Sequence, residues 1–184
     1  MTKSRNYFFL ALLCLPFSIQ AQQSNRHALD SIYQYYSESN KIDSSIARFV
    51  HGDLILGDDS MTYALLDRLT SHNRSLAPLY VHVLDQIVIE TQDNVSLGEV
   101  IGEYQGDILL NNFAVVVREF IADEKQHPMA PMLKRYAGGI AQDIDLQDVR
   151  TYKTYSKWLE RACRSHEERL FVQRFLKMVK SESK

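Results

Sequence analysis

The sequence predicts an all-α protein, folded as a compact array or bundle of about six to eight antiparallel helices. In most segments, apolar residues recur three and four positions apart, as Leu65 and Leu69 do within residues 61–72. Candidate caps precede these segments, here Asp59 or Ser60. The 184 residues contain no convincing pair of strand-like segments and no Asn-Gly hairpin turn.

The N-terminal half is expected to hold three helices, near residues 27–39, 61–72 and 75–92. The third takes Pro78 in its first turn, where the missing amide proton is tolerated. Successive pairs, such as 61–72 with 75–92, resemble the antiparallel hairpins of HEAT-like helical arrays. This resemblance covers about a third of the chain and carries no functional residues, and no fixed repeat of about 33 to 45 residues accompanies it.

Caps and glycines predict the helix ends in the middle of the chain. The segment Ser96–Glu99 has the form of a capping box, in which a serine and a glutamate side chain each satisfy a backbone amide. Gly102 and Gly106 are expected to bend or break the helix that follows. Asp107 is a candidate cap for the next helix, which the sequence HPMAP at 127–131 should end.

Three more helices are expected towards the C-terminus. The first is short and ends at the adjacent glycines Gly138 and Gly139. The second is expected to begin at a cap on Asp145 and to continue to about Arg164, and the third begins after Ser165.

The N-terminal residues predict a secretory signal. The sequence MTKSRNYFFLALLCLPFSIQAQQ combines a basic start with an apolar run over residues 7–17, and cleavage is expected after Ala21. The apolar run is shorter than the roughly 18 residues that a membrane-spanning helix needs, and no later segment reaches that length. Residues 22–184 are therefore expected to form a single exported domain, periplasmic or secreted.

The stretch ERACRSHEERLF contains the first half of a zinc-binding H-E-x-x-H helix. The second histidine is missing, because Leu170 occupies its position and falls in an apolar stripe predicted to face the core. Ser165 and Glu168 form a further capping box, so the chain should break between Cys163 and His166. We therefore predict a helix start and no metal site, and no glycine-rich phosphate loop points to a cofactor.

Cys163 is the single cysteine of the expected mature chain, so no internal disulfide can form. A lone thiol of this kind is most often a small buried apolar residue. The functional alternatives are an intermolecular bridge or a reactive thiol.

A catalytic alternative rests on Glu99, Glu103 and His82. The two glutamates lie four positions apart, so one helix face would carry both, either as acid and base or as ligands of a hard cation. His82 lies three positions before Asp85, the arrangement of a base and its orienting carboxylate. The competing interpretation is a solvated acidic face and a packed histidine.

Charge is divided unevenly along the chain. Residues 22–149 carry 9 Lys or Arg against 19 Asp or Glu, whereas residues 150–184 carry 10 Lys or Arg against 4 Asp or Glu. Tyr155 and Trp158 are expected to flank a basic stripe on the penultimate helix, which Arg174, Lys177 and Lys184 roughly continue on the last helix. Five cations spaced three or four apart make up this stripe: Arg150, Lys153, Lys157, Arg161 and Arg164.

Such a stripe could bind an acidic protein or an anionic surface, or simply be solvated and balance the acidic body. Nucleic acid is not expected, because the chain is predicted to be exported and its net charge is −2. Opposite charge on one molecule also permits head-to-tail association of copies. The sequence thus favours an exported, non-catalytic interaction protein, such as an adaptor, an inhibitor or immunity-type protein or an assembly factor. The alternative is a periplasmic or extracellular enzyme with a carboxylate acid/base site.

Overall fold

The computed structural model describes residues 26–126, 132–146 and 152–183, and the regular structure within them is helical throughout. The predicted all-α class is confirmed. These ranges hold nine helical segments, slightly above the expected six to eight. They are residues 26–37, α2 (Ser44–Val50), α3 (Ser60–Leu69), α4 (Ala77–Glu90), α5 (Val95–Asn111), α6 (Phe113–Gln126), α7 (Met132–Leu146), α8 (Tyr152–Ala162) and α9 (His166–Glu182).

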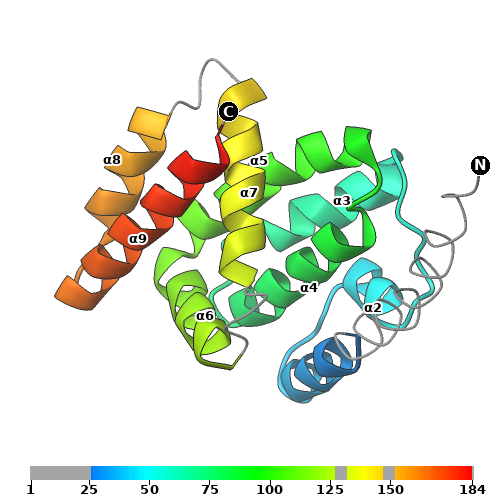
Figure 1. Ribbon diagram of the computed structural model, residues 1–184. Coiled ribbons are helices and arrows are strands. Elements are labelled where there is room, and N and C mark those ends of the chain that lie inside the picture. Colours follow the sequence, from blue (N-terminus) through cyan, green and yellow to red (C-terminus); the bar gives the residue numbers. More distant parts are fainter. Residues whose placement is uncertain (1–25, 127–131, 147–151, 184) are drawn as a thin grey trace, which may run out of the picture.

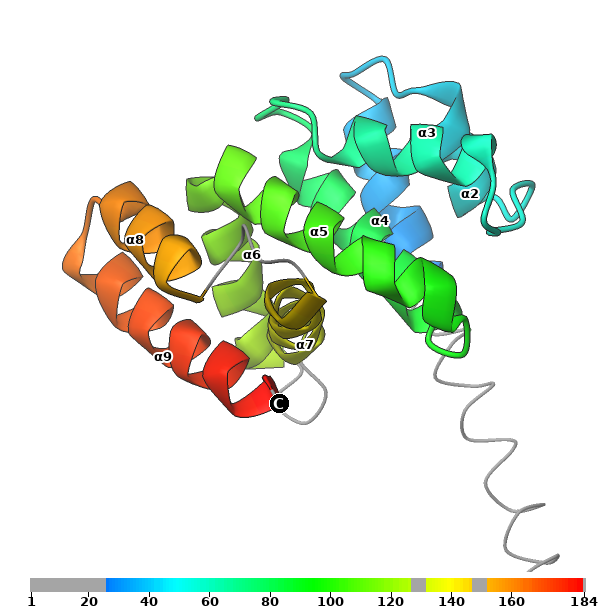
Figure 2. The same ribbon diagram turned by 90° about the horizontal axis from the view of Figure 1, so that it is seen from above.

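The helices are arranged around α7, which packs against α4, α5, α6 and α9. Figure 1 shows α7 crossing in front of α5, with α8 and α9 at one end of the molecule and α2 at the other. The view from above places α7 nearly end-on, between α5 and α9 (Figure 2). No helix within the described residues combines the length and the apolar character needed to cross a membrane. The expected signal segment lies outside the described residues.

The helix that the sequence did not predict is α2, which has only seven residues. Its apolar residues Ile46, Phe49 and Val50 are buried against the neighbouring helices. Asp43 caps it, accepting hydrogen bonds from the Ser45 backbone amide at 2.9 Å and hydroxyl at 2.7 Å. The serine hydrogen bonds favour the carboxylate and lower the pKa of Asp43.

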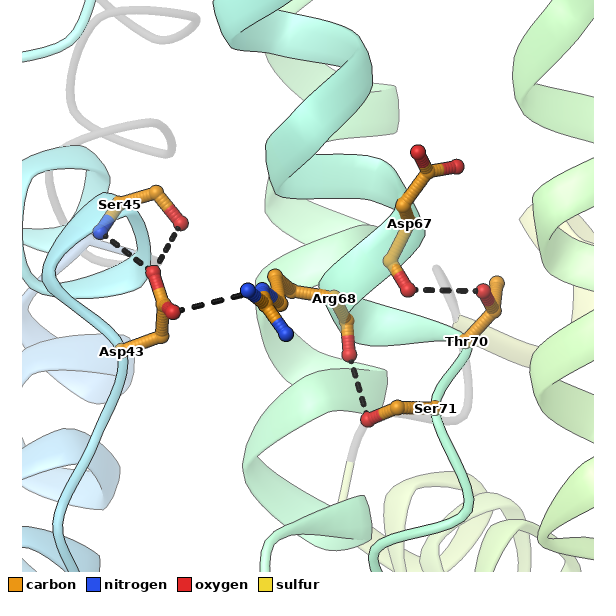
Figure 3. Close-up of polar contacts among 6 residues, drawn as sticks. All are labelled: Asp43, Ser45, Asp67, Arg68, Thr70 and Ser71. Atoms are coloured by element: carbon orange, nitrogen blue, oxygen red, sulfur yellow. Dashed lines mark hydrogen bonds and ion pairs between the residues drawn. The ribbon is translucent and has the colours of Figure 1, made fainter.

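Asp43 also joins α2 to α3, because its carboxylate lies 3.4 Å from Nε of Arg68 (Figure 3). Figure 3 further shows the end of α3, where the hydroxyls of Thr70 and Ser71 donate to the carbonyls of Asp67 and Arg68. At the start of α3, Asp59 is the cap, accepting from the amides of the second and third helical residues.

Two predicted caps are wrong, because α5 is longer than expected. Asn94 caps α5 by accepting from the amide of Leu97 at 3.2 Å, and Ser96 lies inside the first turn. Asp107 also lies inside α5, which continues to Asn111. The C-terminal end is fixed by Asn111, whose side-chain amide donates to the carbonyl of Thr70 at 2.8 Å.

The glycines expected to interrupt helices instead let two helices approach. Gly102 and Gly106 lie within α5, and Gly138 and Gly139 lie within α7, which continues through Asp145 to Leu146. A Cβ on Gly102 would lie 2.2 Å from the carbonyl oxygen of Gly139, closer than any packed side chain can come. The absence of a side chain therefore allows the backbones of α5 and α7 to touch. Asp145 is a residue of α7 and not the predicted cap of α8.

We expect Gly102→Ala to lower the free energy of unfolding by about 1–3 kcal/mol, because the added methyl group meets the backbone of α7 and cannot be accommodated by a rotamer change. Gly98→Ala is the matched control on the same helix. A Cβ there meets nothing within 4 Å, so alanine should raise stability by about 0.5–1 kcal/mol through helix propensity. Urea unfolding followed by circular dichroism measures both. Equal effects at the two positions would contradict the close crossing.

Candidate interaction surface

The helix that carries the predicted basic stripe is anchored by Tyr155. This side chain is buried, and its hydroxyl donates to Asp143 of α7 at 2.9 Å. The hydroxyl occupies the space beside Gly106, where a Cβ would lie 2.1 Å from it. Tyr155 does not flank the stripe as predicted, because it faces the crossing of α5 and α7. Together with Leu159, it fixes which side of α8 points inward.

Three of the five predicted stripe residues lie exposed on α8, namely Lys153, Lys157 and Arg161. Their spacing of four places them along one side of the helix. Arg164 is also exposed but lies after the end of α8 at Ala162, so the stripe does not continue along the helix as far as predicted. Arg150 lies outside the described residues.

An aromatic side chain adjoins these cations. Trp158 is 40 % exposed and lies three positions before Arg161, on the adjacent side of α8. Its ring meets that of Tyr155 edge-on, with the centroids 5.9 Å apart, so Tyr155 supports the indole from the buried side of α8. Among the described residues, no acidic side chain lies within 4 Å of the charged groups of Lys153, Lys157 or Arg161. We call Trp158 and these three cations the α8 basic face.

The turn after α8 is a helix start, as predicted. Ser165 caps α9, accepting from the amide of Glu168, while the Glu168 carboxylate accepts from the amide of Ser165 at 3.0 Å. Cys163 is partly buried and donates to the carbonyl of Leu159, and burial raises the pKa of its thiol, which disfavours the reactive thiolate. Within the described ranges, no three His, Cys, Asp or Glu residues are grouped so as to hold a metal ion.

His82 and Asp85 have different hydrogen-bond partners, so they are not paired as a base and its orienting carboxylate. His82 Nε2 lies 3.3 Å from a carboxylate oxygen of Glu119 on α6. Asp85 accepts two hydrogen bonds from the guanidinium of Arg135 on α7, at 2.7 and 2.5 Å. Burial raises the pKa of Asp85, and the hydrogen bonds from Arg135 oppose that rise. These pairs tie α4 to its neighbours within a polar seam of the core.

The carboxylates of the catalytic alternative lie on α5, and Glu99 is exposed to solvent. The catalytic hypothesis requires Glu99, Glu103 and His82 around one cavity. His82 is instead paired with Glu119, and none of the three lines either of the two hollows described below. Tyr104, beside Glu103, donates to Asp67 of α3 at 2.9 Å, and burial together with that bond raises its pKa to about 12. This part of α5 therefore serves to hold α3.

Two adjoining hollows between α6 and α9 form a groove, with volumes of about 420 and 620 Å³. Below it, Phe120 of α6 stacks on Phe171 of α9, their centroids 6.1 Å apart. Leu170 lines the groove and is 49 % exposed, so the prediction that it faces the core is wrong. Arg174 and Lys177, expected to continue the basic stripe, line the groove instead, and Lys184 lies outside the described residues. We call this hollow the α6–α9 groove.

The chain was compared with models of protein families, with curated proteins and with solved structures, and no significant match was found in any of the three.

The groove and its exposed leucine were not predicted from the sequence. Leu170 has helical spacing with Phe171 and Phe175, which are buried, and periodicity alone does not separate an inward leucine from one at the edge of the apolar face. The α8 cations were predicted because lysine and arginine are rarely buried without a partner, whatever the fold around them.

We expect Arg135→Met to destabilise the fold by about 3–5 kcal/mol near pH 7, because Asp85 would stay buried without its cation. The pKa of the orphaned carboxyl would rise further in the folded state. Its folded form then binds a proton more tightly than the unfolded chain does, so the loss is small below the unfolded pKa and grows as pH rises.

Urea unfolding at about pH 4 and about pH 7 tests this. Lys134→Met, an exposed change at the adjacent position of α7, is the control. The double variant Asp85→Leu/Arg135→Met should recover much of the loss at neutral pH. A loss of equal size at both pH values would contradict a buried charge pair.

Proposed function

We propose that the protein is an exported, non-catalytic interaction protein, and that the α8 basic face is one of its contact surfaces. The observation that carries the proposal is the arrangement of Lys153, Lys157 and Arg161 beside the half-exposed Trp158. We expect the partner to be another protein with an acidic surface, or else an anionic surface that is not a protein. Export rests on the signal sequence predicted for the first 21 residues.

The combination of charge and aromatic area supports this proposal more than charge alone does. Exposed cations accelerate and orient encounter with an acidic partner but add little affinity by themselves. A tryptophan held in place by packing supplies apolar contact area at small entropic cost, and such residues contribute much of the energy in known interfaces. Tyr155 positions Trp158 from the buried side of α8, so the surface is formed before any partner arrives.

The cations of the α8 basic face also differ from those engaged elsewhere in the molecule. Arg26 is paired with Glu90 at 2.7 Å, and Arg135 is paired with Asp85. The three α8 cations make no such pair within the described part of the chain, which leaves them available to an acidic partner. Other exposed cations, such as Lys125 and Lys177 of the α6–α9 groove, also form no such pair within the described residues, so it is the neighbouring Trp158 that distinguishes the α8 basic face.

We expect the purified protein to retain a native partner that the variant Lys153→Glu/Lys157→Glu/Arg161→Glu loses. The matched control reverses three exposed cations on other helices and loops, Lys41→Glu/Arg74→Glu/Lys134→Glu, and has the same net charge. Affinity capture followed by mass spectrometry identifies the partner, and binding is then measured with it. Trp158→Ala should weaken that binding at least tenfold.

Circular dichroism establishes that each variant folds. Retention of the same partner by both triple variants would show that α8 is only a solvated face. Loss of binding in the control variant as well would point to non-specific attraction by net charge.

A further inference from the structure

The loop between α2 and α3 presents an apolar side chain to solvent. Ile55 is 89 % exposed, and Met61 at the start of α3 is also exposed. Three aspartates surround this pair in the sequence, Asp53, Asp58 and Asp59, and each is exposed. Two cations lie beside the start of the loop: Arg48 donates to the backbone carbonyl of Asp53, and the guanidinium of Arg26 lies close to Gly52. The loop is thus an apolar knob within an acidic surface.

This knob is held in a defined conformation. Gly52 adopts a φ of 80°, which only glycine takes up without strain, and turns the chain out of α2. Leu54, next to Ile55, is buried and anchors the loop to the core. On the other side, the amide of Gly57 donates to the hydroxyl of Thr62 at 3.1 Å. These three features hold the loop in a conformation that exposes Ile55.

The α6–α9 groove has the complementary character. Val117, Ile121, Leu170 and Phe171 supply its apolar lining. Four cations and three acidic residues also line the groove, and two of the acidic residues already have partners within the protein. Glu124 lies 3.4 Å from Arg174, and Glu168 accepts from the amides that precede α9.

The cations left without a described acidic partner are Arg118, Lys125 and Lys177, against the single acid Glu167. An apolar side chain flanked by carboxylates is the group that such a groove would hold. The larger hollow is open to solvent and has a volume of about 620 Å³, which leaves room for an isoleucine side chain.

The knob and the groove cannot meet within one molecule. In both views the loop before α3 lies at the end of the molecule away from α8 and α9 (Figures 1 and 2). A contact between them requires two molecules. We propose that the protein associates head to tail, with Ile55 of one copy seated in the α6–α9 groove of the next.

The contact is heterologous, so each copy would offer one knob and one groove. Asp53 would face Lys125 and Lys177 across it, together with Asp58, which also accepts from the hydroxyl of Tyr63 at 2.7 Å, and the association should weaken as salt rises. A single seated side chain with exposed charges around it buries little area, so the contact should be weak. This inference is independent of the α8 basic face, which lies outside the groove.

Sedimentation velocity of the purified protein between about 10 µM and about 1 mM tests the proposal. The mean mass should rise with concentration, and Ile55→Glu or Leu170→Glu should each raise the dissociation constant at least tenfold. Tyr35→Glu, which changes an exposed aromatic residue on the helix 26–37, is the control and should associate like the wild type. The triple α8 variant should also associate like the wild type.

A mixing experiment separates a lost contact from a lost fold. The Ile55→Glu variant keeps its groove and the Leu170→Glu variant keeps its knob, so the two mixed should form a 1:1 dimer that neither forms alone. A wild type that stays monomeric up to about 1 mM would overturn the proposal. So would association that survives both substitutions, a mixture that fails to pair, or loss of association in the triple α8 variant.

Discussion

The contact between Gly102 of α5 and Gly139 of α7 is the constraint on which the rest of the structure depends. Because the two backbones touch, α7 lies close against α5, and from this position it also contacts α4, α6 and α9. The next glycine of α5, Gly106, leaves the space that the hydroxyl of Tyr155 fills, and this sets the position of α8. Thus Gly102 sets the crossing of α5 and α7, and Gly106, four residues later, sets the position of the helix that carries the α8 basic face.

The polar groups of the core follow from the same close packing. Asp143 and Gln105 are buried where α5, α7 and α8 meet, and Asp85 is buried where α4 meets α7. Asp143 accepts from Tyr155 of the following helix, and Asp85 accepts from Arg135, which lies 50 residues further along the chain. Apolar contacts alone would permit several registers between helices, whereas a paired buried carboxylate permits few. We therefore expect these links to favour one arrangement of the array over its alternatives.

The sequence predicted the fold class, the cap at Ser165 and the exposure of the α8 cations, because each depends on local chemistry. It did not predict α2, which has too few residues for a periodic pattern, or the continuity of α5 and α7 through their glycines. Glycine favours a break when only the local chain is considered, and only the neighbouring helix shows why Gly102 and Gly139 are needed. The exposure of Ile55 and Leu170 could not be predicted either, because a pattern of apolar residues does not show which of them lack a packing partner.

The small share of α8 in the core has a consequence for its dynamics. The helix contributes only two fully buried side chains, Tyr155 and Leu159, whereas α4 buries nine residues. The free energy needed to detach α8 locally is therefore a fraction of that needed to unfold the molecule. Amide protons of α8 should exchange with solvent well before those of α4. A partner bound to α8 would slow that exchange, so occupancy of this surface and local order are thermodynamically linked.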